Sequence, residues 1–364
     1  MTRRRCLAAI ATSLAACGDA HSDAVASERP PSPSKAQLEP NDVAILFPLA
    51  VTDDGYLSPS SRGAAGELIP REVYEHAFGP AGSTMLGGTP PAPALDGLRV
   101  VALRFDPCFA ALPPIEAARC VAQLRLVFQT IHFDPRGSEA TDEAVHAFYT
   151  LDRRQLDAAT AELAALRHDR KLGALAPHPI IVDEGMTGEL ATAVSRIVLR
   201  HAGAENLSRI TGITSSGLGT AWNFFGADIA RGSATPIAIP GLPDARLEAF
   251  FAGFTPGALT GDPAITPRPQ LATEDDLFVL ADPEPERARR AIDRIENPTI
   301  HTANTIDCAS CHLAASFRAM TGSAGGKVNV HMFGYAGRTP SIQPRTIREV
   351  DTTLAYLGAA DSTP

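Results

Sequence analysis

Hydrophobic positions along this chain follow two different periods, which predict strands in some segments and helices in others. Short apolar or alternating runs are typical of strands. They occur at residues 43–47, 98–105, 121–128, 179–183, 207–214 and 222–229. Apolar residues spaced three and four apart indicate helices with one buried face. That spacing occurs at residues 152–171 and 187–202, and a short helix is expected near residues 70–77.

Strands that alternate with helices predict an α+β domain over residues 42–259, with a mixed sheet flanked by helices. The helix expected over residues 152–171 has the clearest boundaries, because Asp152 can cap its start and Gly173 follows its end. Prolines then become dense, so residues 260–283 are interpreted as a linker.

The last part of the chain, residues 284–360, carries two more amphipathic patterns. Apolar residues three and four apart recur over residues 286–296 and again over residues 344–358. Each pattern predicts a helix with a single apolar stripe. We therefore expect these residues to form a small all-α module beside the larger α+β domain.

The composition is ordinary for a globular protein and disfavours one class of partner. The 364 residues leave room for two domains and a tether. Hydrophobic residues make up 45% and charged residues 20% of the chain, and the formal net charge is −9. A negative net charge argues against a nucleic-acid partner, because phosphates attract basic surfaces. The sequence contains no P-loop, GxGxxG, GxSxG or HExxH motif.

The first residues have the pattern of an export signal. Three consecutive arginines, Arg3–Arg5, precede an apolar run at residues 7–16 that is too short to span a bilayer. The run ends in Leu14-Ala15-Ala16-Cys17, which resembles the lipobox of bacterial lipoproteins. That resemblance implies that residues 1–17 are a lipoprotein signal and that Cys17 becomes the lipidated first residue of the mature chain.

The segment that follows, residues 18–41, holds few apolar residues and several Pro and Ser residues. Such a composition predicts a disordered tether. The protein is therefore expected to be exported and anchored by lipid to the bacterial cell envelope. It would face either the periplasm or the cell surface.

The most specific chemical motif is Cys308-Ala309-Ser310-Cys311-His312. Two cysteines separated by two residues, followed directly by histidine, form the attachment pattern for c-type haem. The two thiols add to the two vinyl groups of the porphyrin, and the imidazole of the histidine binds iron from one face. The motif predicts one covalent haem c, held by Cys308 and Cys311, with His312 as the proximal iron ligand.

Two other uses of a Cys-x-x-Cys pair fit less well. A redox disulfide is expected at the start of a helix after a strand, and it would leave His312 unexplained. A zinc site needs further Cys or His ligands, and no second cysteine pair remains for one.

The two predicted helices on either side of the motif resemble those of the small monohaem c-type cytochromes. In that family a methionine ahead of the last helix usually binds the far face of the iron. The resemblance therefore implies Met332 as the distal ligand. The neighbouring His331 is an alternative, His301 is a further option, and an open sixth position also stays possible.

Two cysteines have no place in the lipobox, the haem motif or the signal segment. Cys108 and Cys120 form an even pair in a chain that is expected to be exported, which predicts a disulfide between them. Two buried free thiols are the alternative.

These patterns together predict a membrane-tethered monohaem cytochrome that transfers single electrons outside the cytoplasm, between a donor and an acceptor protein of unknown identity. We expect an electron carrier rather than a catalyst. Two alternatives stay open: a lipoprotein that senses or binds a small ligand at the haem, and a redox enzyme that uses the haem as its electron port.

Overall fold

The computed structural model describes residues 38–79, 92–108, 121–166, 171–215, 221–238, 247–251, 285–303, 306, 308–322 and 328–360. Within it, Ser34–Pro364 forms one compact unit. The predicted signal (1–17) and linker (260–283), and most of the predicted tether, lie outside the described residues. The first described helix, α1 (Pro40–Val43), already includes the last two residues assigned to the tether.

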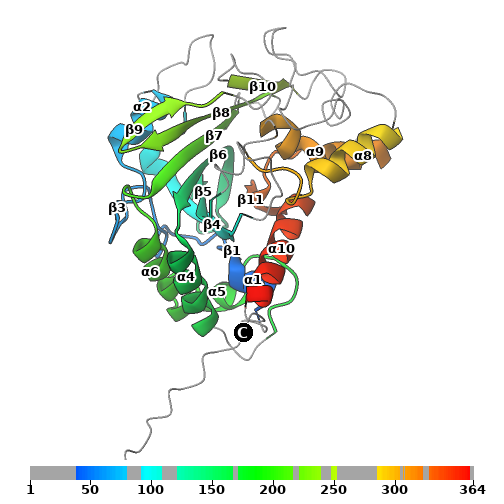
Figure 1. The fold of residues 1–364 in the computed structure, drawn as a ribbon. Helices are drawn as coiled ribbons and strands as arrows, with labels where there is room; N and C mark the ends of the chain where they lie inside the picture. Colours follow the sequence, from blue (N-terminus) through cyan, green and yellow to red (C-terminus); the bar gives the residue numbers. More distant parts are fainter. Residues whose placement is uncertain are drawn as a thin grey trace, which may run out of the picture. The chain divides into compact units, whose positions relative to one another are not determined.

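One large sheet organises the described residues (Figure 1). Its strands are β1 (Ala44–Leu46), β4 (Leu98–Asp106), β5 (Gln123–His132), β6 (Glu139–Thr150), β7 (Leu207–Ser215), β8 (Ala221–Ala230), β9 (Ser233–Pro236) and β10 (Leu247–Phe251). The strand order is β1-β4-β5-β6-β7-β8-β10, and β9 also pairs with β8.

Every pairing between these strands is antiparallel. The α+β class is therefore confirmed, whereas the prediction of a mixed sheet is wrong. The physical reason is that β4, β5 and β6 pair in chain order, as do β7 and β8, so no helix has to cross between parallel neighbours. A two-stranded hairpin, β2 (Arg62–Gly63) and β3 (Gly66–Glu67), lies apart from this sheet.

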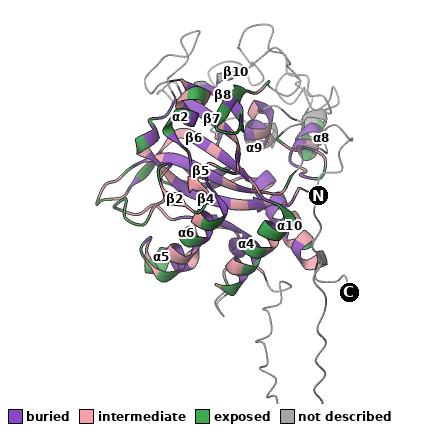
Figure 2. Ribbon diagram, turned by 60° about the vertical axis from the view of Figure 1, so that its left-hand side comes forward, coloured by how far each residue is buried: buried purple, intermediate pink, exposed green. Residues whose placement is uncertain are grey.

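Helices cover the first face of the sheet. They are α2 (Arg71–Phe78), α4 (Arg153–Ala165), α5 (Pro179–Glu184) and α6 (Glu189–His201), with a short 3₁₀ turn at Leu95–Gly97. Alternate residues of β6, namely Val145, Ala147 and Tyr149, enter the core beneath these helices. Figure 2 shows the strands largely buried and the outer sides of α5 and α6 exposed.

The helices near residues 70–77 and 187–202 are confirmed as α2 and α6. The helix predicted over residues 152–171 is confirmed as α4, capped by Asp152 through a hydrogen bond from the Gln155 amide, but it ends earlier, at Ala165. The strand predicted over residues 179–183 is wrong, because this run forms helix α5. Pro179 fixes a helical φ at the first position of the helix, and Gly185, at φ 82°, ends it after six residues.

The C-terminal part of the chain packs on the second face of the sheet. It comprises α8 (Pro285–Ile295), α9 (Cys308–Gly322), β11 (Phe333–Ala336), β12 (Thr339–Ile342) and α10 (Pro344–Ala360). The two predicted helices are confirmed as α8 and α10, but an all-α module is wrong. The sequence between α9 and α10 turns at Gly337, at φ 61°, and forms a hairpin.

A buried glutamine joins this hairpin to the sheet. Gln129 on β5 is fully buried, and its Nε2 donates to the carbonyl oxygens of Thr141 at 3.0 Å and Tyr335 at 2.9 Å. Its Oε1 accepts from the Tyr335 amide at 2.8 Å. A Cβ on Gly334 would lie 2.7 Å from that oxygen, so the close approach requires glycine.

We predict that Gln129→Ala lowers the free energy of unfolding by about 2–4 kcal/mol, because buried backbone groups lose their partners. Urea denaturation measures the change. Gln123→Ala, on the same strand but beside the cavity described below, serves as the control and should change stability by less than about 1 kcal/mol. Equal effects of the two substitutions would contradict the role assigned to Gln129.

Candidate functional site

The Cys-x-x-Cys-His motif forms the first turns of α9, which begins at Cys308. Neither cysteine belongs to a disulfide, and both are partly buried. A spacing of three places Cys308 and Cys311 next to each other on the helix surface. Ala309 and Leu313 of the same helix pack against a hydrophobic cluster that includes Phe224 of the sheet. The sheet therefore fixes the side of α9 on which the motif lies.

The imidazole of His312 is held in one tautomer. Its Nδ1 lies 2.7 Å from the carbonyl oxygen of Val330. A carbonyl can only accept, so Nδ1 carries the proton and the unprotonated nitrogen is Nε2. Among the described residues Nε2 has no hydrogen-bond partner. Burial lowers the pKa of His312 to about 4, although the bond to Val330 acts in the opposite direction.

The segment that carries Val330 is itself held by both neighbouring helices. Ser316 on α9 donates to the Asn329 carbonyl at 3.1 Å and accepts from the Asn329 amide at 2.9 Å. Gln343, which directly precedes α10, donates to the same carbonyl at 3.0 Å. These contacts fix the carbonyl oxygen that orients His312.

Both distal ligands predicted from the sequence lie next to this segment. His331 is buried, and its Nε2 forms a 2.7 Å contact with the carboxylate of Asp142. The other oxygen of Asp142 accepts from Trp222 Nε1 at 2.5 Å. Met332 is also buried, and its sulfur lies 4.0 Å from Cys311 Sγ. His301 was the further candidate ligand. Its backbone carbonyl accepts a hydrogen bond from Arg345 on α10.

A histidine that the sequence analysis did not select lies opposite His312. The ring centroids of His146, on β6, and His312 are 5.6 Å apart, and the planes differ by 22°. The ring centroid of Phe224, on β8, lies 5.5 Å from that of His312. Burial, with the nearby His312 and Arg104, holds the pKa of His146 well below its usual range. The sequence could have indicated His146 through its position in an alternating strand, but strand β6 was not predicted.

A buried charge cluster lies beside these rings and joins α10 to the sheet. Glu349 on α10 forms ion pairs with Arg104 on β4 and with Arg345 at 2.9 Å, and it lies 3.9 Å from Arg125 on β5. Burial by itself raises the pKa of Glu349, but the three arginines outweigh it and bring the pKa to about 2. The cluster therefore contains an ionised carboxylate at neutral pH.

The same cluster positions the chain that leads to the haem motif. Arg345 donates from Nη1 to the carbonyl of Ile295 at 2.7 Å and from Nη2 to that of His301 at 2.6 Å. Arg125 also pairs with Asp106. Three arginines then face two carboxylates, which leaves one positive charge in excess. The buried Nε of Arg104 has no hydrogen-bond partner in the described part of the chain.

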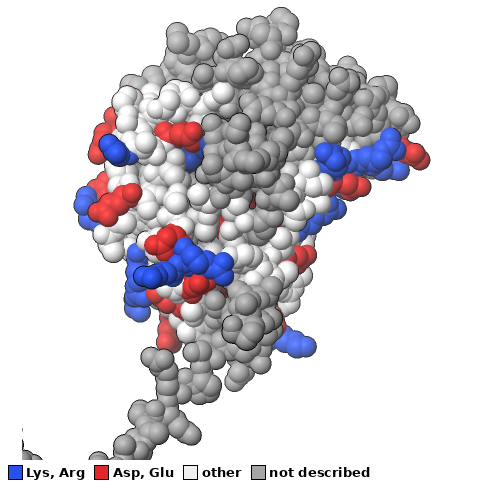
Figure 3. All heavy atoms as spheres, in the orientation of Figure 1, with Lys and Arg blue, Asp and Glu red and all other residues white. Residues whose placement is uncertain are grey.

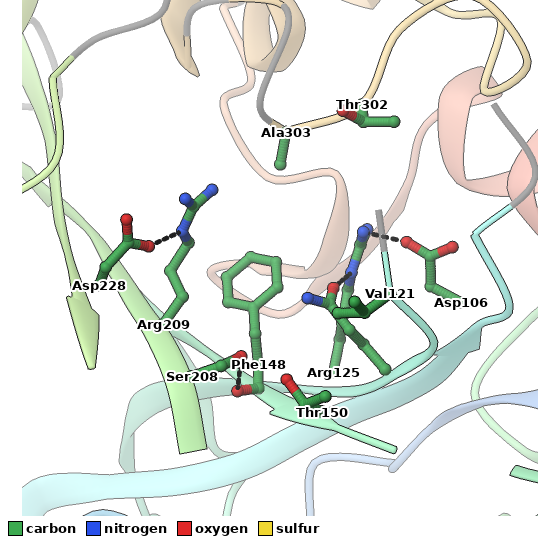
Figure 4. Close-up of a pocket in the computed structure, with 11 residues that line it drawn as sticks. Asp106, Val121, Arg125, Phe148, Thr150, Ser208, Arg209, Asp228, Thr302 and Ala303 are labelled. Carbon is green, nitrogen blue, oxygen red and sulfur yellow. Dashed lines mark hydrogen bonds and ion pairs between the residues drawn. The ribbon is translucent and has the colours of Figure 1, made fainter. Parts of the chain in front are cut away.

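A cavity of about 250 Å³ opens next to the cluster (Figure 4). Arg125, Phe148 and Arg209 form its floor on three adjacent strands, and Thr302 and Ala303 lie across from them, shortly before the haem motif.

The charges in this cavity are already paired. Arg209 Nε donates to Asp228 at 2.7 Å, and Arg125 pairs with Asp106. On the molecular face drawn in Figure 3, basic and acidic side chains of the described residues are likewise interspersed. The cavity is therefore polar without a strong field of one sign.

Comparisons with known proteins add no assignment: no family model, no curated protein and no solved structure matches this chain. None of the helices within the described ranges is long and apolar enough to cross a membrane. The disulfide between Cys108 and Cys120 and the lipidation of Cys17 stay predictions, because Cys120 and Cys17 lie outside the described residues.

Glu349 yields a prediction about pH. Its pKa in the folded protein, about 2, lies below the value of about 4.3 expected in the unfolded chain. The contribution of ionised Glu349 to the free energy of unfolding is therefore complete above the pKa of the unfolded chain and is lost as the pH falls towards 2. At neutral pH, Glu349→Gln should lower stability by about 3–5 kcal/mol, because it leaves buried arginines unpaired.

Urea denaturation at a series of pH values tests this prediction. The difference in free energy of unfolding between wild type and Glu349→Gln should narrow below about pH 5. Asp228→Asn is the control, because its side chain is 53% exposed and its pair with Arg209 should contribute less than about 1 kcal/mol. A gap of constant size across the pH range would contradict the ionised state assigned to Glu349.

Proposed function

We propose that this protein is a membrane-tethered monohaem c-type cytochrome that transfers single electrons outside the cytoplasm. The observation that carries the proposal is the state of His312 within the attachment motif. Its Nδ1 is committed to the Val330 carbonyl and its Nε2 has no partner among the described residues. A histidine ligand is commonly oriented by a hydrogen bond of its other nitrogen to a backbone carbonyl.

The residues around the motif fit a haem in two further respects. Cys308 and Cys311 are outside any disulfide and neighbour each other on the surface of α9, as attachment to two vinyl groups of one porphyrin requires. The excess positive charge of the arginine cluster and the unpaired Arg104 Nε suit the carboxylates that a porphyrin carries. When bound, the haem supplies one-electron chemistry between ferrous and ferric iron.

The protein's own residues would bind, orient and enclose this group. Val330 fixes the ring of His312, and the Glu349 cluster holds the chain before the motif against α10. Phe224 and the neighbouring apolar residues of the sheet restrict water near His312. A ligand set held in place by its surroundings needs little rearrangement when the charge of the iron changes, which favours electron transfer.

The envelope location of the proposal depends on the sequence alone. The lipobox ending at Cys17 places the chain where haem c is attached, and residues 18–41 would let the folded part reach redox partners from the membrane surface. The donor and acceptor are proteins in this proposal, and nucleic acid has no part in it.

The cavity beside the motif supports a second candidate function. A volume of about 250 Å³ between Phe148 and Thr302 is enough for a small molecule. A redox enzyme could bind its substrate there and pass electrons through the haem, and a sensory protein could bind its ligand there. The paired state of Arg125 and Arg209 favours a neutral polar molecule over an anion.

The haem itself is tested with Cys308→Ala combined with Cys311→Ala. Wild-type protein, made in a strain that attaches haem c, should keep its haem on a denaturing gel, whereas the double variant should lose it. Ser310→Ala, between the two thiols, should keep the haem because the attachment chemistry does not use that side chain. Haem-free wild type would overturn the proposal.

The anchor is tested with Cys17→Ser. Without a thiol to accept lipid, the variant should move from the membrane fraction to the soluble fraction after cell lysis, while the unmodified chain stays with the membranes. Metabolic labelling with a fatty acid gives an independent readout, with label on the wild type only. A wild-type chain that carries no lipid would contradict the anchor without affecting the haem assignment.

A further inference from the structure

We infer that His146 is the second axial ligand of the haem iron, opposite His312, an inference that rests on the proposed function. The ring centroids of His146 and His312 lie 5.6 Å apart, and the two ring planes are 22° from parallel. Two imidazoles that bind one metal from opposite sides, through bonds of about 2 Å, have centroids roughly 6 Å apart. The observed pair is close to that separation.

The side chain of His146 forms no hydrogen bond or ion pair with the described residues. It is partly buried, and within that part of the chain neither of its ring nitrogens forms a hydrogen bond. An iron bond would satisfy one of the two nitrogens and explain why a histidine occupies this strand position.

The strand positions beside His146 carry small side chains, which suits the approach of a flat group. In the antiparallel register His146 lies between Val127 on β5 and Thr211 on β7, and the same row continues to Ala102 and Gly226. These neighbours are all small. His146 is therefore the tallest side chain in its row on the face towards α9.

The neighbouring row has the opposite character. It runs through Arg104, Arg125, Phe148 and Arg209. Large and charged side chains thus border the row of His146 on one side, and the buried Nε of Arg104, which has no partner among the described residues, offers a donor for a porphyrin carboxylate.

The ligands expected from the sequence are less suited to the position opposite His312. Met332 lies two residues after Val330, whose carbonyl anchors the proximal imidazole. A side chain so close to the proximal anchor would have to pass around the porphyrin edge to reach the other face. His331 is already engaged, because its Nε2 binds Asp142 at 2.7 Å. Neither obstacle applies to His146, because it lies on β6 and not on the segment that carries Val330.

The test uses the full-length, haem-loaded protein and its absorption and electron paramagnetic resonance spectra. Wild type should be low-spin in the ferric state and lack the long-wavelength iron–sulfur band. His146→Ala should become high-spin, bind carbon monoxide readily in the ferrous state, and return to low spin when imidazole is added. Met332→Ala, the matched control, should keep the wild-type spectrum.

His146→Met provides a gain of signal that a merely structural role would not produce. It should introduce the iron–sulfur band and raise the reduction potential, because a methionine ligand favours the ferrous state. A wild-type iron–sulfur band that disappears in Met332→Ala, or a low-spin spectrum that persists in His146→Ala, would overturn the inference while leaving the proposed function intact. A protein that attaches no haem would overturn both.

Discussion

The ion pairs of Glu349 are the interaction on which the rest of the site depends. A single carboxylate on α10 meets arginines from β4, from β5 and from its own helix, in surroundings that exclude most water. Charges buried in this way are expensive unless all are paired, so the cluster tolerates only one relative position of helix and strands. Because Arg345 also binds the carbonyls of Ile295 and His301, that position extends to the chain before the haem motif.

The two histidines lie close together as a consequence of this packing. His312 belongs to α9 and His146 to the middle of the sheet, and they are 166 positions apart in the sequence, as their numbers show. Only the seating of the C-terminal helices on the second face of the sheet brings the rings to 5.6 Å. In the proposed function the large antiparallel sheet would therefore supply one side of the haem site.

Local patterns predicted much of the fold, and long-range contacts explain most of the rest. Periodicity located α4 and α6, and alternation located β4, β5, β7 and β8, because those signals come from each segment's own burial. Strand β6 (Glu139–Thr150) was missed, since its first half is rich in polar residues and is mostly only partly buried, which hides the alternation of buried positions. The run at 179–183 was ambiguous by composition, and only Pro179 and Gly185 marked it as a helix. His146 is visible as a candidate only once β6 and α9 are placed together.

Attachment of haem to Cys308 and Cys311 is the central claim, and the intact mass of the purified protein tests it most directly. Denatured wild type from a strain that attaches haem c should be heavier than the mature polypeptide and its lipid by the mass of one haem. Peptide mapping should place that mass on the peptide that contains both cysteines. A denatured chain without this added mass, or with the mass on another peptide, would contradict the claim.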